Sequence, residues 1–466
     1  MKYISTRNSK IKVSFIETFL NGLALDGGLY IPKIIPKFSK SSFYRLSKLK
    51  YHELAFEIIK IFTDKTFSNS ELKKIIKKSY SSFSSKEVIK LSKIETYNLL
   101  ELYHGPTFAF KDIAMQIIGN MYENILLKKK KKINLIVATS GDTGAAAINA
   151  IANKQNVKIF VLFPKGKISS IQRKLMTTVS AKNVFNIAIK GTFDDCQNLV
   201  KSMFNDSKFR NSVNLSGVNS INWARIIAQV VYYFYAYLHF TNRKNKMVFS
   251  VPTGNFGDIY AGYIAFKMGV PISKLIIATN ENDLLDRFIK TGIYKPGVVK
   301  STVSPSMDIQ VASNFERLIS DFYNHNSRKV KSLMKNLEKK KFYKVSPNVL
   351  KKIKNIFYSN SVNSKKVINL IKFLYKKNHK ILDPHTTIGL FSLMDYKSKN
   401  FNSSENLFFL GTAHPAKFKN TIEKAIDKKI TLPKEIKNVL NKKEKVKILP
   451  NNLNKVKNCI KYNSLY

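Results

Sequence analysis

The order of strands, glycine turns and helices limits what this chain can fold into more than any other feature. The apolar run KINLIVATS (132–140) leads into GDTG and an alanine-rich helical segment, and the apolar run VKIFVLFPKG (157–166) follows. The same order returns in KMVFSVPTGNFGDIYAGYIAFKMG (246–269), which precedes the strand-like KLIIATNEND (274–283). Strands that alternate with helices at this spacing are typical of βαβ units, so the sequence predicts an α/β fold with parallel sheets.

The length and composition predict more than one packed core. The chain has 466 residues, which exceeds the size at which a single core stops growing, and 44% of its residues are hydrophobic. The segments divide it into an N-terminal extension domain (1–95), an α/β domain (96–245), and a second α/β domain with a helical C-terminal part (246–466). We therefore expect two parallel-sheet domains preceded by a smaller N-terminal domain.

The formal charge of +50 raises the question of a polyanionic partner. The lysines are spread along the whole chain, and the longest run, Lys128–Lys132, falls in a turn between a helix and a strand. No zinc-finger spacing, RNP-like strand or basic-leucine repeat accompanies them. Isoleucine, asparagine, phenylalanine and tyrosine are also abundant, and with lysine these are the residues of A/T-rich codons. Codon bias explains the charge, and we expect no specific nucleic-acid partner.

Three features favour a cytoplasmic protein that does not enter a membrane. The opening segment MKYISTRNSKIKVSF lacks the apolar core and the cleavage site of a secretory signal. The most apolar stretch, residues 226–240, is interrupted by Gln229 and His239 and is too short to cross a bilayer comfortably, so it predicts a buried helix. Cys196 and Cys459 lie far apart, which fits neither a disulfide framework nor a metal site.

Three loops stand where strands end, which is where parallel sheets bind ligands. They are TSGDTG (139–144), TGNFGD (253–258) and GTAHP (411–415). The glycines of the first two loops let backbone N–H groups approach a carboxylate or a phosphate at a helix start, and Thr412 offers a hydroxyl in the third. Each loop taken alone is also consistent with a purely structural turn. Neither of the first two matches a P-loop or a dinucleotide-binding fingerprint.

Lys111 follows the rigid, mostly apolar stretch HGPTFAF (104–110) and opens a helical segment. Burial lowers the pKa of a lysine, and a neutral amine attacks a carbonyl to form a Schiff base. The alternative is an ordinary lysine that extends its charged end into solvent at a helix start. Two anion-binding loops and one buried lysine together indicate a cofactor with both a phosphate and an aldehyde, and pyridoxal 5'-phosphate has both.

Five segments occur in the order that is found in the threonine synthase family, and the chain resembles its members. The segments are HGPTFAFKD, ATSGDTGAAA, VPTGNFGD, IATNEND and LGTAHPAKFK. The opening ALDGGLYIP is similar to that of bacterial and fungal members with an N-terminal extension, and the resemblance spans about residues 3 to 450. It implies the tryptophan-synthase-β-like fold, which is fold type II of the pyridoxal-phosphate enzymes.

The resemblance implies a role for each matching residue. Lys111 would bind the aldehyde of the cofactor and act in catalysis, Thr412 would face the pyridine nitrogen, and Asp142 would lie near the 3'-oxygen. An aspartate beside a phenolic oxygen requires either a shared proton or a nearby cation. The cofactor phosphate would lie on the backbone of Gly254, Asn255, Phe256, Gly257 and Asp258.

The family converts O-phospho-L-homoserine and water into L-threonine and phosphate, the last step of threonine biosynthesis. The resemblance implies that Ser140, Gly141 and Thr143 bind the substrate carboxylate. The phosphate of the substrate needs a second anion site, for which the candidates are Lys165, Lys167, Ser220, Asn222 and Arg225. Arg225 is the preferred candidate because a guanidinium group matches two phosphate oxygens at once. Lys165 and Lys167 are equally well explained as surface lysines.

Two other activities on the same fold are open alternatives. A threonine or serine dehydratase would keep the lysine and the glycine loop but has no use for the N-terminal extension, and a phospholyase would lack only the hydration step. A basic binding protein on a decayed enzyme scaffold is disfavoured, because decay would reach Lys111 or Thr412 first. We expect no metal cofactor and a monomer or small homo-oligomer.

Overall fold

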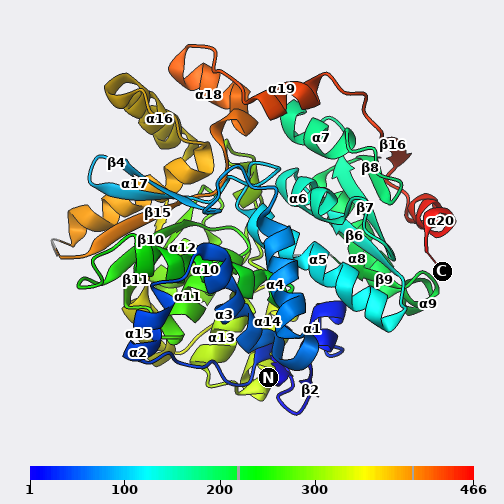
Figure 1. Cartoon of the computed structure of the whole chain (residues 1–466), viewed down its shortest axis with the longest axis horizontal. Coiled ribbons are helices and arrows are strands. Elements are labelled where there is room, and N and C mark those ends of the chain that lie inside the picture. The colour runs from blue at the N-terminus through cyan, green and yellow to red at the C-terminus, as the bar shows by residue number, and fades with distance from the viewer. Residues whose placement is uncertain (218–220, 401–403, 466) are drawn as a thin grey trace.

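Two sheets with helices on both faces form the body of the molecule (Figure 1). The computed structural model describes residues 1–217, 221–400 and 404–465. The larger sheet has six strands in the order β14-β11-β10-β15-β5-β4, and only β4 and β5 are antiparallel neighbours. Its strands are β4 (Lys90–Ile94), β5 (Tyr97–Glu101), β10 (Met247–Pro252), β11 (Ile272–Thr279), β14 (Phe357–Ser361) and β15 (Asn406–Gly411).

The smaller sheet is parallel throughout and has five strands in the order β16-β8-β7-β6-β9. Its strands are β6 (Ile133–Ala138), β7 (Val157–Pro164), β8 (Val184–Lys190), β9 (Leu215–Gly217) and β16 (Lys447–Pro450). The helices between and beside these strands are α5 (Lys111–Lys129), α6 (Asp142–Ile151), α7 (Ser170–Thr177), α8 (Phe193–Asn205), α9 (Ser207–Ser212), α19 (Lys434–Leu440) and α20 (Leu453–Asn463).

Both faces of each sheet are apolar because helices cover both of them. In the larger sheet, Val248 and Ile276 pack with α17 (Pro384–Lys399), whereas Phe249 and Leu275 face the main core with α10 (Trp223–His239) and α11 (Gly257–Lys267). The smaller sheet has one side in the main core with α5 and α6 and the other in a separate cluster with α8 and α20. This double coverage explains the unbroken apolar runs in the sequence.

The N-terminal region packs as a layer of helices and a small sheet against α5 and α10. Its helix starts follow local rules, because Ser14 with Glu17, and Ser68 with Glu71, form capping boxes. The elements are β1 (Tyr3–Ser5), β2 (Lys12–Val13), α1 (Phe15–Asn21), β3 (Tyr30–Pro32), α2 (Lys40–Leu46), α3 (Tyr51–Thr63), the 3₁₀ turn η1 (Asp64–Thr66) and α4 (Asn69–Tyr80).

The remaining elements surround the larger sheet. A long irregular segment with one 3₁₀ turn, η2 (Pro305–Met307), precedes a helical region, and a second 3₁₀ turn, η3 (Pro415–Phe418), follows β15. The others are α12 (Leu284–Thr291), β12 (Ile293–Tyr294), α13 (Phe315–Phe322), α14 (Ser327–Lys340), β13 (Tyr343–Lys344), α15 (Pro347–Ile356), α16 (Ser364–Asn378) and α18 (Lys419–Ile426).

The predicted α/β architecture is confirmed, and each strand–glycine–helix unit lies where its pattern places it. The sheets also cross the predicted division of the chain, since β5 joins the larger sheet and β16 joins the smaller one. The boundaries near residues 95 and 245 therefore stay a prediction. Within the described residues, none of the helices has the length and apolar character that crossing a bilayer requires.

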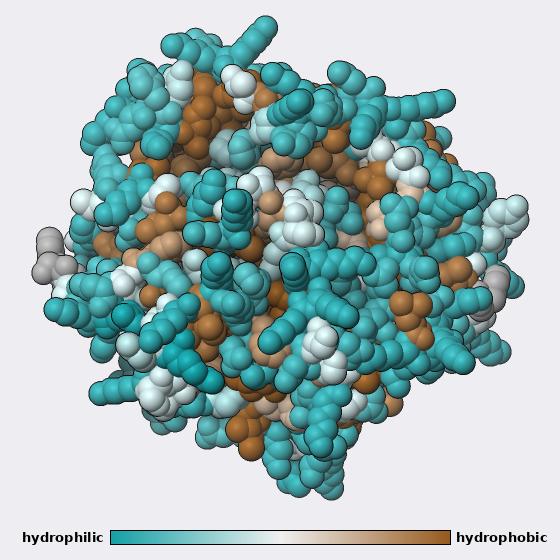
Figure 2. All heavy atoms as spheres, viewed as in Figure 1, coloured by the Kyte–Doolittle hydropathy of each residue, from teal (hydrophilic) through white to brown (hydrophobic). Residues whose placement is uncertain are grey.

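The face of the molecule shown in Figure 2 is mostly hydrophilic, as expected for a chain whose lysines are spread along the whole sequence. Hydrophilic side chains cover most of the face in Figure 2, and the hydrophobic areas between them are small and separate, apart from a hollow near the top. The chain carries 80 lysine and arginine residues against 30 aspartate and glutamate residues. A charge distributed in this way is typical of a solvated surface and does not outline a single binding face.

Arg317 joins the N-terminal region to the rest of the molecule. This fully buried side chain on α13 donates hydrogen bonds to the carbonyl oxygens of Tyr30 (3.0 Å) and Ile221 (2.6 Å), and to Oδ1 of Asn314. Its guanidinium carbon lies 5.5 Å from the centre of the Trp223 ring. Three segments that are distant in sequence are held by one cation.

Arg317→Met should lower the free energy of unfolding by about 3 kcal/mol or more, because each buried acceptor left without a donor costs roughly 1–3 kcal/mol. Urea unfolding followed by circular dichroism measures the change. Arg328→Met, at an exposed position on α14, is the matched control and should change stability by less than about 0.5 kcal/mol. Equal stability of the two variants would contradict this account of Arg317.

Candidate active site

Lys111 is the first residue of α5, and its side chain is only 8% exposed. The loop before it is tightly folded: a Cβ on Gly105 would lie 2.4 Å from the Cβ of Asp112, and Phe108 has a φ of 59°. The carboxylate of Asp112 accepts hydrogen bonds from the N–H (2.8 Å) and the hydroxyl (2.6 Å) of Thr107. The rigid stretch predicted from the sequence therefore buries the Lys111 amine, and the solvent-exposed alternative is wrong.

The surroundings of Lys111 lower its pKa. Burial is the main cause, and the positive charges of Lys417 and Arg225 act in the same direction. Asp142 opposes them, since its Oδ2 lies 3.1 Å from Nζ of Lys111. An amine that is buried between a carboxylate and two cations is a group whose charge can change during a reaction.

Asp142 is the first residue of α6, and four side chains reach its carboxylate. Lys111 and Ser306 approach Oδ2 at 3.1 and 3.2 Å, while Lys417 and Gln172 approach Oδ1 at 2.6 and 2.9 Å. Burial alone would raise the pKa of Asp142, but the two ammonium groups hold it well below its ordinary value. Of the two conditions that an aspartate at this place requires, a shared proton or a nearby cation, the structure has the cation.

Lys417 is the nearby cation, and it was not among the site residues predicted from the sequence. It lies on η3 and is completely buried, and besides Asp142 its amine contacts the carbonyl oxygen of Thr107 at 2.8 Å. A signal was present in the sequence, because Lys417 stands in LGTAHPAKF between small and aromatic residues, five positions after Thr412. A lysine in such a setting is buried only with a partner.

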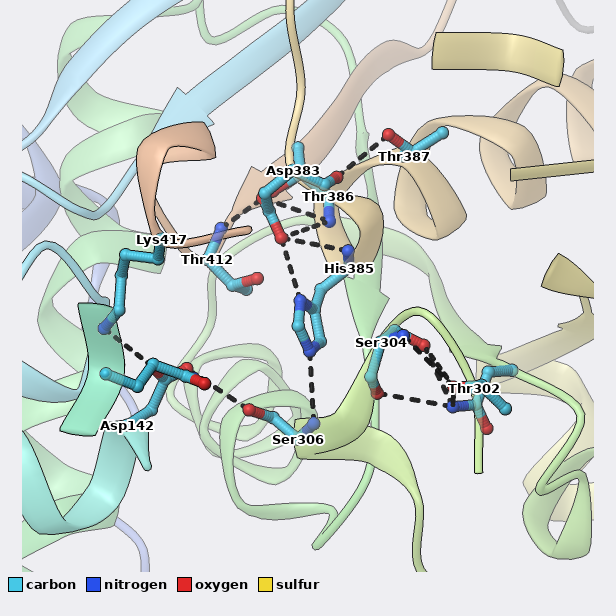
Figure 3. A network of polar contacts seen from close by, with 12 residues as sticks. Asp142, Thr302, Ser304, Ser306, Asp383, His385, Thr386, Thr387, Thr412 and Lys417 are labelled. Carbon is cyan, nitrogen blue, oxygen red and sulfur yellow. Dashed lines mark hydrogen bonds and ion pairs between the residues drawn. The ribbon is translucent and has the colours of Figure 1, made fainter. Parts of the chain in front are cut away.

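A chain of hydrogen bonds connects Asp142 to the loop of Thr412 (Figure 3). The hydroxyl of Ser306 donates to Asp142, and its N–H donates to Nε2 of His385 at 3.2 Å. Nδ1 of His385 lies 2.9 Å from Oδ1 of Asp383, which therefore accepts its proton. The hydroxyl of Thr386 donates to the same carboxylate and accepts from the N–H of Thr412 at 3.1 Å.

Thr412 follows β15 and is 6% exposed. Its backbone is fixed on both sides, because its carbonyl oxygen accepts from the N–H of Phe110, next to Lys111, at 2.9 Å. Its hydroxyl has no hydrogen-bond partner among the described residues. The backbone of Thr412 is held beside the lysine loop while its hydroxyl stays available to a ligand.

The glycine loop between β10 and α11 has the properties of an anion site. Phe256, the N-cap residue of α11, has a left-handed backbone with φ 63°. Among the described residues, no backbone hydrogen bond uses the N–H groups of Gly254, Asn255 or Phe256, and Gly257 begins the helix. A Cβ on Gly254 would lie 3.2 Å from the carbonyl oxygen of Ser306, and a small cavity adjoins this glycine. The loop presents free N–H groups at a helix N-terminus.

The side chain of Asp258 points away from this loop into the contact between α10 and α11. Its Oδ1 accepts from the hydroxyls of Tyr232 and Tyr233, and its Oδ2 has no partner among the described residues. Burial raises the pKa of Asp258 to about 6, although the two tyrosines and Arg225 act against the rise. Any contact of Asp258 with a bound phosphate is limited to its backbone.

The loop that starts α6 offers two hydroxyl groups, while two of its N–H groups are already engaged. The N–H groups of Gly141 and Gly144 already donate to the hydroxyl of Thr139, at 3.0 and 2.9 Å. The hydroxyls of Ser140 and Thr143 are partly exposed and have no hydrogen-bond partner in the described ranges. Gly141 has a φ of 132°, which only glycine adopts freely, so the turn itself depends on this residue.

The five candidates for the substrate phosphate lie in different surroundings. Lys165 and Lys167 are exposed, and Ser220 lies outside the described residues. Asn222 is the N-cap of α10, where its Oδ1 accepts from Ala224 and its Nδ2 donates to the carbonyl oxygen of Phe19. The amide of Asn222 is therefore fully engaged in structure.

Arg225 is buried on the first turn of α10, and its guanidinium group has no hydrogen bond or ion pair among the described residues. Burial lowers its pKa to about 10, and the charge of Asp258 partly opposes this. An unpaired buried cation is costly, so a bound anion is the natural partner of this side chain. Of the candidates that the structure describes, Arg225 is the one whose surroundings call for an anion.

These features define the class. A buried lysine at a helix start, a free N–H loop at a second helix start and a hydroxyl between them are the parts that a pyridoxal-phosphate site uses. Residues 85–410 match the family model described as "Pyridoxal-phosphate dependent enzyme". The chain is a pyridoxal-phosphate-dependent enzyme of fold type II.

The particular family follows from the ends of the chain and from whole-length relatives. Residues 2–80 match the model "Threonine synthase N terminus", and residues 386–460 match "Threonine synthase, C-terminal". Threonine synthases of Pseudomonas aeruginosa and Saccharomyces cerevisiae are each 41% identical, over 458 and 498 residues, which cover 98% of this chain and 97% of each relative. The chain belongs to the threonine synthase family.

Solved structures agree with this assignment. The pyridoxal-phosphate-bound threonine synthase of Brucella melitensis superposes with a TM-score of 0.95 at 39% identity, covering 100% of both chains. The yeast threonine synthase superposes with a TM-score of 0.93 at 40% identity, covering 99% of this chain and 98% of that one. The predicted fold type II architecture with an N-terminal domain is confirmed.

Asp258→Asn should remove part of the pH dependence of stability. Folded Asp258 keeps its proton up to about pH 6, whereas an unfolded aspartate loses it near 3.8, so the free energy of unfolding falls as the pH rises between these values. A shift of about 2 units corresponds to roughly 3 kcal/mol. About 1 kcal/mol of this is already lost by pH 4.5, so urea unfolding at pH 4.5 and pH 7 should show a fall smaller by roughly 2 kcal/mol in Asp258→Asn. Asp194→Asn, at an exposed position, is the control, and a fall of the same size in both variants would refute the prediction.

Proposed function

We propose that Lys111 is the catalytic residue of this chain. The reaction of the chain converts O-phospho-L-homoserine and water into L-threonine and phosphate. The observation that carries the proposal is the contact of 3.1 Å between the buried Lys111 amine and Asp142. The chain belongs to the threonine synthase family, and Lys111 is a buried amine of its candidate active site whose pKa is lowered. Groups with a perturbed pKa are typical of catalytic sites.

The residues of the site fit the cofactor. Lys111 offers the amine for its aldehyde, Thr412 offers a free hydroxyl, and the loop from Gly254 to Gly257 offers unused N–H groups for its phosphate. A side chain at position 254 would crowd the loop, because its Cβ would lie 3.2 Å from the carbonyl oxygen of Ser306. Pyridoxal phosphate, when bound, supplies an electron sink that stabilises negative charge on the substrate.

The protein groups divide the remaining work among themselves. Lys111 in its neutral form removes the proton from the α-carbon of the substrate and returns protons later in the reaction. Asp142 stays ionised between Lys111 and Lys417 and holds the Lys111 amine in place. Thr412 would hold the ring nitrogen of the cofactor through a hydroxyl, which does not force that nitrogen to carry a proton.

The substrate carries two anionic groups, and the site has two places for them. The hydroxyls of Ser140 and Thr143, at the N-terminus of α6, are suited to the carboxylate. Arg225 is suited to the phosphate, because its guanidinium group is buried and lacks a partner in the described part of the chain. Arg225 lies close enough to Lys111 for its charge to lower the pKa of that lysine.

Lys111→Ala should abolish the visible absorbance band that bound pyridoxal phosphate gives to the wild-type chain, because the other buried lysine of the described residues, Lys417, is held by Asp142 and Thr107. The assay records the spectrum before and after addition of O-phospho-L-homoserine and measures phosphate and threonine. Equal amounts of the two products are expected for the wild type. Phosphate with 2-oxobutyrate in place of threonine would identify a phospholyase, and no band in the wild type would overturn the proposed function.

Arg225→Lys should raise KM for O-phospho-L-homoserine by roughly 10- to 100-fold, since a hydrogen bond to a charged group contributes about 1.5–3 kcal/mol. The spectrum of bound pyridoxal phosphate in this variant should remain that of the wild type. Lys165→Met and Lys167→Met are the comparison, because both lysines are exposed. If KM rose more in either lysine variant than in Arg225→Lys, the substrate phosphate would bind at the β7–α7 loop and the assignment to Arg225 would be wrong.

We also propose a cytoplasmic location, action as a monomer or small homo-oligomer, and no specific nucleic-acid partner. Cys196 and Cys459 are both buried free thiols in the described structure, which supports a reducing compartment. The lysines, which are spread along the whole sequence, support only weak, salt-sensitive attraction to polyanions.

A further inference from the structure

Lys417 has the least exposed amine of the site and comes from a different part of the fold than its partners. It lies on η3, just after β15 of the larger sheet, and is 0% exposed. Its partner Asp142 begins α6, just after β6 of the smaller sheet, and its second partner, the carbonyl oxygen of Thr107, lies in the loop that leads to Lys111. One ammonium group therefore joins three segments around the reactive lysine, and its contact with Asp142 is drawn in Figure 3.

The two oxygens of Asp142 are divided between two lysines. Oδ2 faces Lys111 at 3.1 Å, and Oδ1 faces Lys417 at 2.6 Å. A buried carboxylate with a single lysine would form a closed ion pair, which would keep that lysine protonated. With a second, fully buried cation present, Asp142 stays compensated when Lys111 gives up its proton.

We propose that Lys417 is a positioning residue that keeps Asp142 ionised and in place and, through its positive charge, favours the neutral form of the Lys111 amine. The inference rests on the proposed function, since it assigns a use to the neutral amine. Lys417 itself does not need to touch the substrate.

The charged groups around Lys111 come from several elements, and their effects agree with this role. Asp142 on α6 favours the charged amine, whereas Lys417 on η3 and Arg225 on α10 favour the neutral one. On its own helix, Asp112 is turned toward Thr107, and on α17 Asp383 is bound to His385. Removal of Lys417 takes away one of the two cations that lower the pKa of Lys111.

The test follows the rate at which the visible band forms when pyridoxal phosphate is added to the full-length chain, over the range from about pH 6 to about pH 10. This rate reports the fraction of neutral Lys111 amine, so it measures the group on which the inference depends. In Lys417→Met the pH profile should move to higher pH by about one unit, which slows band formation at pH 7 roughly 10-fold. Lys417→Arg keeps the cation and should keep the wild-type profile.

Two further variants separate this role from a loss of structure. Lys417→Gln can still donate to Asp142 and Thr107 but has no charge, so it should fold and show the same shift as Lys417→Met. Lys424→Met, at an exposed position on α18, should change neither the profile nor the thermal unfolding temperature. A folded Lys417→Gln with an unshifted profile would overturn the inference while the wild-type band still supports the proposed function. A wild-type chain that forms no band would overturn both.

Discussion

The carboxylate of Asp142, held between the ammonium groups of Lys111 and Lys417, is the interaction on which the site depends. Charges leave water at a high cost, and they are tolerated inside a protein only when the geometry pairs them well. Because the three residues belong to α5, α6 and η3, this requirement connects both sheets. The contact with Asp142 holds the Lys111 amine in position, whereas burial and the charges of Lys417 and Arg225 lower its pKa.

The parts of the fold that obey local rules were predictable from the sequence. The glycine loops after β6 and β10 were predicted because a strand, a turn and a helix each leave a pattern within about ten residues. Lys111 was predicted as a buried amine because Gly105, Pro106 and the phenylalanines stand next to it in the chain. Thr412 was selected on the resemblance and the end of an apolar strand, and its free hydroxyl agrees with that choice.

Other features depend on contacts between distant segments, which no local pattern contains. Lys417 looked like one lysine among many, and only the packing of η3 against α6 makes it a buried cation. Asn222 was grouped with the phosphate candidates, although its amide caps α10 and binds the carbonyl oxygen of Phe19, about 200 residues away. The side chain of Asp258 follows the same logic, since its tyrosine partners lie on the preceding helix.

The N-terminal region belongs to the same network of constraints and is not an accessory layer. Arg317 binds the carbonyl oxygens of Tyr30 in that region and of Ile221 just before α10, the helix that carries Arg225. Its third partner, Asn314, donates from its N–H (3.1 Å) and its Nδ2 (3.0 Å) to the carbonyl oxygen of Asn255 in the glycine loop. The glycine loop and the start of α10, which are the two proposed anion sites, are thus fixed through one buried arginine. A loosened N-terminal region would disturb both sites together, because the guanidinium group that holds β3 also holds the segments on which these sites are built.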